Sequence, residues 1–166
     1  MTYWHRFLDL NAAADVGRVQ LGLDYIRKYW WQALQAVMTT LLEAFDPAWM
    51  GDDPHAVSMV GAEYARYGGY ETSLCHGWSA GPAAWLHTAV LGVQPDTFGY
   101  AKVNFTPCLG DLAWAKGTIP TPHGPVLVSL WMERNGTQAA EITTPGEIEF
   151  NLPEHIQKAW KVILNP

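Results

Sequence analysis

The sequence changes character near residues 92–97, and this change limits what the chain can fold into. Before it, apolar residues recur at helical spacing, most clearly between Val19 and Val37. After it, proline or glycine interrupts the sequence every few residues, and short stretches alternate apolar and polar side chains. Helices followed by strands indicate two separate layers or domains. We therefore predict an α+β chain, with a helical part over residues 1–93 and an antiparallel β part over residues 94–166.

The helical part begins with two predicted helices, over residues 2–15 and 19–37, separated by a short break at Asp15-Val16-Gly17. A break this short implies that the two helices form an antiparallel pair. The apolar face of the first helix comprises Tyr3, Phe7, Leu8 and Ala12, and that of the second comprises Val19, Leu23, Ile26, Trp30, Leu34 and Val37.

The helical period is lost over residues 39–71 and returns near Pro82. A stretch of this length without helical periodicity is either a functional loop or a structured segment that the pattern misses. Its aromatic residues favour a packed, functional loop. We predict a further helix from Pro82 to about Leu91, with Ser79 as its N-terminal cap and Gly92 as its stop.

In the β part, the alternating stretches predict short strands at Ala101–Phe105, Val126–Leu130 and Ile148–Leu152. Each of these stretches places its apolar residues on one face, as a strand packed on a core requires.

Charge and cysteine content exclude several classes of partner and site. The net charge of −6 argues against a nucleic-acid partner, which needs a basic face. No apolar run is long enough to span a membrane, and the first ten residues lack the pattern of a signal peptide. The two cysteines, Cys75 and Cys108, match neither a zinc site nor a disulfide framework. We therefore expect a cytoplasmic protein with no cofactor and no metal.

The stretch Thr72–Leu86, TSLCHGWSAGPAAWL, gathers a thiol, an imidazole, an indole and a hydroxyl before the predicted helix. Gly77-Trp78-Ser79-Ala80-Gly81 matches the pattern of a nucleophile elbow, but no strand precedes it, so a Ser79 hydrolase is a weak alternative. Cys75 beside His76 is also a weak nucleophile candidate, because such partners meet in space rather than in sequence. An aromatic-rich loop that opens a helix suits a polar, planar or sugar-like ligand better. The chain has nine tryptophans, most of which we expect in the core, although tryptophan also forms platforms for sugar rings.

Glu43 follows two leucines in TTLLEAFDPAW. An apolar setting disfavours the charged form of a carboxylate, which suits it to general acid or base chemistry. Glycoside hydrolysis uses a pair of such carboxylates, and Glu63 or Glu71 is a conceivable partner. The spacing does not choose between them.

Three runs of the sequence together resemble a known enzyme family. They are LDYIRKYWWQALQAVMTTLLEAFDPAW, YGGYETSLCHGWSAGPAAWL and LGVQPDTFGYAKVNFTPCLGDLAWAKGTIPTPHGPVLVSLW, which cover nearly the whole chain. They are similar to the C-terminal third of bacterial α-L-rhamnosidases of glycoside hydrolase family 78. The resemblance implies the late helices of a six-hairpin (α/α)6 barrel followed by an antiparallel β-sandwich. It also implies inverting hydrolysis of terminal α-L-rhamnose.

The resemblance assigns roles to three residues. Glu43 occupies the position of the general base in the family's Thr-Thr-Phe-Trp-Glu motif. His76 occupies the position of a histidine that lines the sugar site. Trp78 is adjacent to His76 and would form part of the pocket wall. The chain departs from the family at Leu42, where a tryptophan is usual, and near Val37, where a glycine is usual. The loss of that tryptophan would remove a contact near the base.

In the family, the general acid lies in the first part of the barrel, which we expect upstream of Met1. We therefore expect a C-terminal segment that carries the base, acts on rhamnose-containing glycosides only with its missing part, and is inactive alone. Helices without their barrel neighbours would expose apolar faces, so we also expect self-association. The alternatives are a non-catalytic carbohydrate-binding or structural module and, more weakly, an unrelated Ser or Cys hydrolase.

Overall fold

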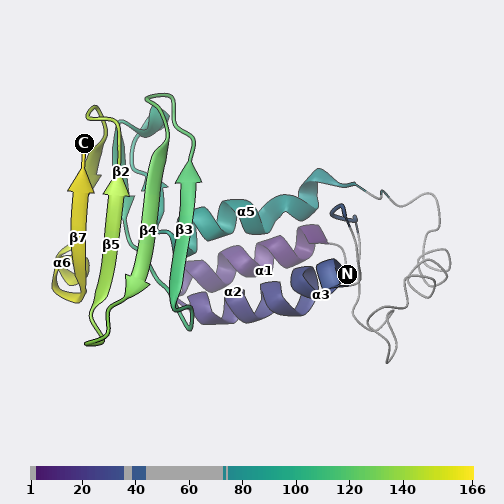
Figure 1. The fold of residues 1–166 in the computed structure, drawn as a ribbon. Helices are drawn as coiled ribbons and strands as arrows, with labels where there is room; N and C mark the ends of the chain where they lie inside the picture. Colours follow the sequence, from purple (N-terminus) through teal and green to yellow (C-terminus); the bar gives the residue numbers. More distant parts are fainter. Residues whose placement is uncertain (1–2, 36–38, 44–72, 74) are drawn as a thin grey trace. The chain divides into compact units, whose positions relative to one another are not determined.

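A computed structural model describes residues 3–35, 39–43, 73 and 75–166 of the chain (Figure 1). The chain forms two compact units, Met1–Ala84 and Trp85–Pro166. The division falls inside the helix predicted over residues 82–91, because the last turn of that helix packs against strands β1 and β3 of the second unit. The domains 1–93 and 94–166 stay a prediction.

The described part of the first unit is helical. Its elements are α1 (Tyr3–Asp15), α2 (Val19–Ile26), the π-helical turn η1 (Arg27–Trp31), α3 (Gln32–Gln35), the 3-10 turn η4 (Gly77–Ala80) and the start of α5 (Gly81–Trp85). Gly17 joins α1 to α2 with a φ of 70°. The two helices pack side by side, as the sequence predicts for an antiparallel pair (Figure 1).

The buried face of α1 differs from the predicted one. Tyr3, Arg6, Leu10 and Ala13 are buried, whereas Leu8 is 48% exposed. Arg6 belongs to the buried face because its guanidinium lies 3.5 Å above the ring of Tyr29, where a cation–π contact offsets part of the cost of desolvating the charge. The spacing of apolar residues therefore predicted the helix and the burial of Tyr3 correctly, but it placed Leu8 and Ala12 on the buried face wrongly.

The second unit begins with Trp85, the last residue of α5, and the π-helical turn η5 (Leu86–Val90), followed by two sheets. The three-stranded sheet has the order β1 (Val93–Pro95), β2 (Lys102–Phe105), β6 (Glu149–Asn151). The four-stranded sheet has the order β3 (Trp114–Ile119), β4 (Val126–Met132), β5 (Gln138–Thr143), β7 (Trp160–Asn165). The 3-10 turn η6 (Phe98–Tyr100) precedes β2, and helix α6 (Glu154–Ala159) precedes β7.

One hydrophobic core joins the two sheets, and Figure 1 shows β2 behind the four-stranded sheet. Val103 and Phe105 enter the core from β2, and Val128 and Leu130 enter it from β4. This arrangement confirms the predicted α+β class and the β-sandwich. Adjacent strands are antiparallel except for β2 with β6 and β5 with β7, which are parallel. No helix in the described ranges is long and apolar enough to cross a membrane.

Gly92 ends the helical segment, as the sequence predicts, and it does so with a φ of 72°. Its carbonyl accepts a hydrogen bond from the N–H of Thr106 at 2.9 Å. A Cβ atom at this position would lie 2.3 Å from the carbonyl carbon of Thr106 and from the nitrogen of Pro107. Only glycine therefore fits here without a shift of the neighbouring backbone.

We expect Gly92→Ala to lower the free energy of unfolding by more than about 2 kcal/mol, because backbone strain and a backbone clash add. Gly136→Ala is the matched control: Gly136 also has a positive φ, 85°, but a Cβ atom added there would meet no atom within 4 Å. That control should lose only about 1 kcal/mol. Urea denaturation followed by circular dichroism measures both, and equal losses would contradict the role of the close approach.

A second prediction concerns alkaline pH. Burial, together with the hydrogen bond from its hydroxyl to Asp9 Oδ2 at 2.8 Å, raises the pKa of Tyr25 from 10.0 to about 12. The folded state therefore holds this proton longer than the unfolded state. The contribution to stability is complete below pH about 10 and is lost as the pH rises toward about 12. Tyr25→Phe should flatten this part of the stability profile, and identical profiles for the two proteins would contradict the assignment.

Candidate functional site

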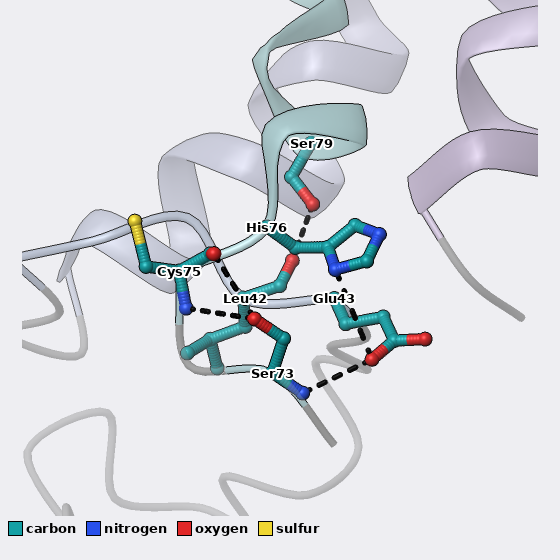
Figure 2. Close-up of polar contacts among 6 residues, drawn as sticks. All are labelled: Leu42, Glu43, Ser73, Cys75, His76 and Ser79. Carbon is teal, nitrogen blue, oxygen red and sulfur yellow. Dashed lines mark hydrogen bonds and ion pairs between the residues drawn. The ribbon is translucent and has the colours of Figure 1, made fainter.

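Two segments that are far apart in the sequence lie side by side in the first unit (Figure 2). The N–H of Glu43 donates to the carbonyl of Ser73 at 2.9 Å, and the N–H of His76 donates to the carbonyl of Leu41 at 2.8 Å. This short pairing brings Glu43 and His76 together, although 33 positions separate them in the sequence numbering.

The carboxylate of Glu43 is held by the backbone on one side. Its Oε2 accepts a hydrogen bond from the N–H of Ser73 at 3.0 Å and lies 3.9 Å from Nδ1 of His76. The side chain of Glu43 remains 30% exposed, so its surroundings are more polar than the two preceding leucines suggested. A carboxylate that is oriented in this way and reached by solvent can accept a proton from a water molecule.

His76 presents one ring nitrogen that has no hydrogen-bond partner among the residues the structure describes. That atom, Nε2, is buried, whereas Nδ1 faces Glu43. The indole of Trp78 contacts the imidazole edge-to-face, with ring centres 4.9 Å apart and planes at 89°. A buried polar atom without a partner is costly, so His76 Nε2 is suited to a hydrogen bond with a bound polar group.

Trp78 is exposed and extends the site outward. Its side chain is 55% exposed, and its ring centre lies 5.4 Å from that of Trp4, which is 41% exposed. The sequence did not single out Trp4, because a tryptophan early in an amphipathic helix most often packs in a core. It also missed Ser73, which acts through its backbone N–H and so leaves no signal in residue type.

The two nucleophile alternatives find little support in the geometry. Ser79 is fully buried, and its hydroxyl donates to the carbonyl of Leu42. Ser79 lies inside the 3-10 turn η4, whose N-cap residue is His76, and its hydroxyl bonds to Leu42 rather than serving as the predicted helix cap. Its own carbonyl accepts the indole N–H of Trp30 at 2.7 Å. Cys75 is exposed, and Figure 2 shows its sulfur directed away from the ring of His76.

The partner carboxylates considered for Glu43, Glu63 and Glu71, lie outside the described residues. Within the described ranges, no cluster of three or more His, Cys, Asp or Glu side chains could hold a metal ion.

Residues 92–159 match the family described as the bacterial alpha-L-rhamnosidase C-terminal domain. Over 74 residues, 43% of this chain, the sequence is 38% identical to an alpha-L-rhamnosidase of Alteromonas sp. (strain LOR). The fold is similar to the crystal structure of a GH78 family rhamnosidase of Bacillus sp. GL1, with a TM-score of 0.76 and 30% identity over 99% of this chain. The resemblance to the C-terminal part of family 78 α-L-rhamnosidases is confirmed.

The matches cover only a small part of these larger proteins. The aligned region is 8% of the Alteromonas protein and 16% of the Bacillus chain. The β-sandwich of the second unit contains most of the residues that match the C-terminal domain family. Glu43, His76 and Trp78 lie before residue 92, outside that family match and inside the structural match.

We expect Ser79→Ala to lower the free energy of unfolding by about 1–3 kcal/mol, because it leaves the buried carbonyl of Leu42 without its donor. Cys75→Ala, on the same loop but exposed, should change stability by less than about 0.5 kcal/mol. Thermal or urea unfolding of the two variants measures this difference. A Ser79→Ala protein of unchanged stability would show that the hydroxyl is not structural.

Proposed function

We propose that this chain supplies the general base and part of the sugar site of an inverting α-L-rhamnosidase. The observation that carries the proposal is the position of Glu43. Its carboxylate accepts the N–H of Ser73, faces His76 at 3.9 Å and keeps access to solvent. The names of the similar proteins support rhamnose-containing glycosides as the substrate class.

In this proposal Glu43 activates the attacking water. The carboxylate takes a proton from the water while the water oxygen bonds to the anomeric carbon, on the face opposite the leaving group. The glycosidic C–O bond breaks, and a general acid protonates the departing oxygen. In an inverting enzyme the two carboxyl groups stand about 6.5–9.5 Å apart to admit the water. In this proposal a different part of the enzyme supplies the acid.

His76 and Trp78 bind the sugar in this proposal. The buried Nε2 of His76 would exchange a hydrogen bond with a sugar hydroxyl and so gain the partner that the described residues do not provide. The exposed indole of Trp78 would cover an apolar C–H face of the ring. Because Nδ1 of His76 faces Glu43, the same imidazole would also help to hold the base in place.

The alternative is a non-catalytic carbohydrate-binding or structural module. A large share of the chain lies in the β-sandwich unit, and this unit contains neither Glu43 nor His76. This favours a module without a catalytic role. The two proposals differ in whether the first unit can activate water. The expected cytoplasmic location and the expected self-association stay predictions. Exposed apolar side chains on the helices, such as Leu8 and Leu21, are consistent with association.

The sharpest test uses a leaving group that needs no acid. We expect the isolated chain to show little or no hydrolysis of an aryl α-L-rhamnoside, but measurable hydrolysis of α-L-rhamnosyl fluoride, because fluoride departs without protonation. Glu43→Gln should reduce the fluoride reaction by about 10²–10⁴-fold. Glu149→Gln, a change on the second unit, is the matched control. NMR should detect the β-anomer of rhamnose as the first product.

Binding separates the roles of the three residues. Glu43→Gln should keep rhamnose binding, whereas His76→Ala or Trp78→Ala should weaken it about tenfold, as expected when an anchor contact is removed. Fast turnover of the fluoride that Glu43→Gln leaves unchanged would rule out Glu43 as the base. Sugar binding that depends on His76, without any turnover, would favour the non-catalytic module. A hydrolytic activity lost only in Ser79→Ala or Cys75→Ala would favour an unrelated hydrolase.

A further inference from the structure

The outward faces of the two sheets in the second unit differ in chemistry. The outward face of the three-stranded sheet is polar, and its side chains bond to one another. Asn151 donates to Asn104 at 2.7 Å, Asn104 donates to Asp96 at 2.8 Å, and Lys102 pairs with Glu149 at 3.0 Å. The polar side chains of this face therefore have partners within it.

The outward face of the four-stranded sheet carries tryptophans instead. The register places Trp114 on β3 directly opposite Trp131 on β4. Trp114 is 67% exposed, so its indole offers an aromatic surface to solvent beside that of Trp131. Trp131 is half-buried and pairs across β4 and β5 with Ala139, a small residue that is fully buried although it lies on the outward face. The two indoles therefore occupy one end of this face.

The next row of the same face is polar on three of its four strands. Lys116, Ser129 and Glu141 lie opposite one another across β3, β4 and β5, and Ile163 follows on β7. Glu141 accepts one hydrogen bond within the sheet, from Asn165 at 3.0 Å, and its carboxylate keeps further acceptor capacity. Alternation along each strand puts this row on the same side of the sheet as the tryptophans, two residues further along. Flat aromatic surface and hydrogen-bonding groups thus stand side by side, about 7 Å apart along the strands.

A sugar ring combines an apolar C–H face with hydroxyl groups at its rim. We propose that the outward face of the four-stranded sheet binds a saccharide chain, with Trp114 and Trp131 stacking on sugar rings and the row of Lys116, Ser129 and Glu141 binding hydroxyls. That this saccharide bears rhamnose rests on the proposed function. Saccharide binding to this face does not depend on Glu43 or His76, which belong to the first unit.

A protein partner fits this face less well than a saccharide. A packed interface would bury Lys116 and Glu141, and burying charged groups is costly unless each finds a matched partner. A hydrated saccharide lets both side chains keep contact with water. A nucleic acid is disfavoured by the chain's net charge of −6.

The test uses the full chain and affinity electrophoresis in gels containing a soluble rhamnose-bearing polysaccharide, with a rhamnose-free polysaccharide as the second probe. Each variant is compared with the wild-type chain in both gels. We expect Trp114→Ala to weaken retardation by the rhamnose-bearing probe about tenfold. Asn104→Ala, on the outward face of the other sheet, is the control and should change nothing. His76→Ala reports on the proposed first-unit site instead, where it should weaken the binding of free rhamnose about tenfold.

Trp114→Thr places a β-branched residue, which favours strands, at this position and guards against loss of folding, which thermal unfolding checks. Binding weakened in both Trp114 variants and kept in the Asn104→Ala control supports the proposal. Binding of the rhamnose-free probe with the same dependence on Trp114 supports the site and removes only its link to rhamnose. Unchanged binding in both Trp114 variants would overturn the proposal. Loss of binding in His76→Ala alone would also overturn it. The same holds if sedimentation shows that Trp114→Ala only dissociates an oligomer and does not change binding.

Discussion

The candidate site depends on a short backbone pairing between Leu41–Glu43 and Ser73–His76. Two N–H···O=C bonds, at 2.9 and 2.8 Å, set how far apart the carboxylate and the imidazole stand. Side chains reinforce the pairing: Ser79 donates to the carbonyl of Leu42, and Trp30 donates to the carbonyl of Ser79 at 2.7 Å. Buried bonds of this kind are expensive to leave unmade, so they resist local opening better than exposed contacts do. The functional side chains are therefore positioned by backbone and by structural neighbours that take no part in chemistry.

In this arrangement, the side chains of the Thr72–Leu86 stretch have roles that differ from those their chemical groups suggest. The hydroxyl and the thiol are the obvious nucleophiles, but one is buried in a structural bond and the other points away from the imidazole (Figure 2). Within the part of the chain that the structure describes, the groups of this stretch left to bind a ligand are His76, through Nε2, and the exposed indole of Trp78. The stretch thus shapes a binding surface, and the group suited to proton transfer comes from Glu43 on the other segment.

The sequence predicted the class of fold, the helix stop at Gly92 and three of the strands, because each leaves a local pattern. It missed β3, whose residues Trp114, Lys116 and Thr118 face outward and whose inward positions include Gly117, so alternation of apolar residues is weak there. It chose the wrong face of α1 because Arg6 is buried over Tyr29, a contact that hydrophobicity does not register. In the site, residue types suggested Glu43, His76 and Trp78, whereas Ser73 and Trp4 matter only through their positions in space.

The pairing of the two segments also restricts the number of residues in one part of the chain and not in another. Glu43 and His76 face each other only while Ser73 and His76 keep their spacing, because one inserted residue would turn the following side chains to the opposite side. The stretch between Glu43 and Ser73 is under no such restriction from this pairing, since the cost of closing a loop grows slowly with its length. Homologous chains that preserve this geometry should therefore tolerate insertions and deletions between these two residues, while the few residues around His76 stay constant in number.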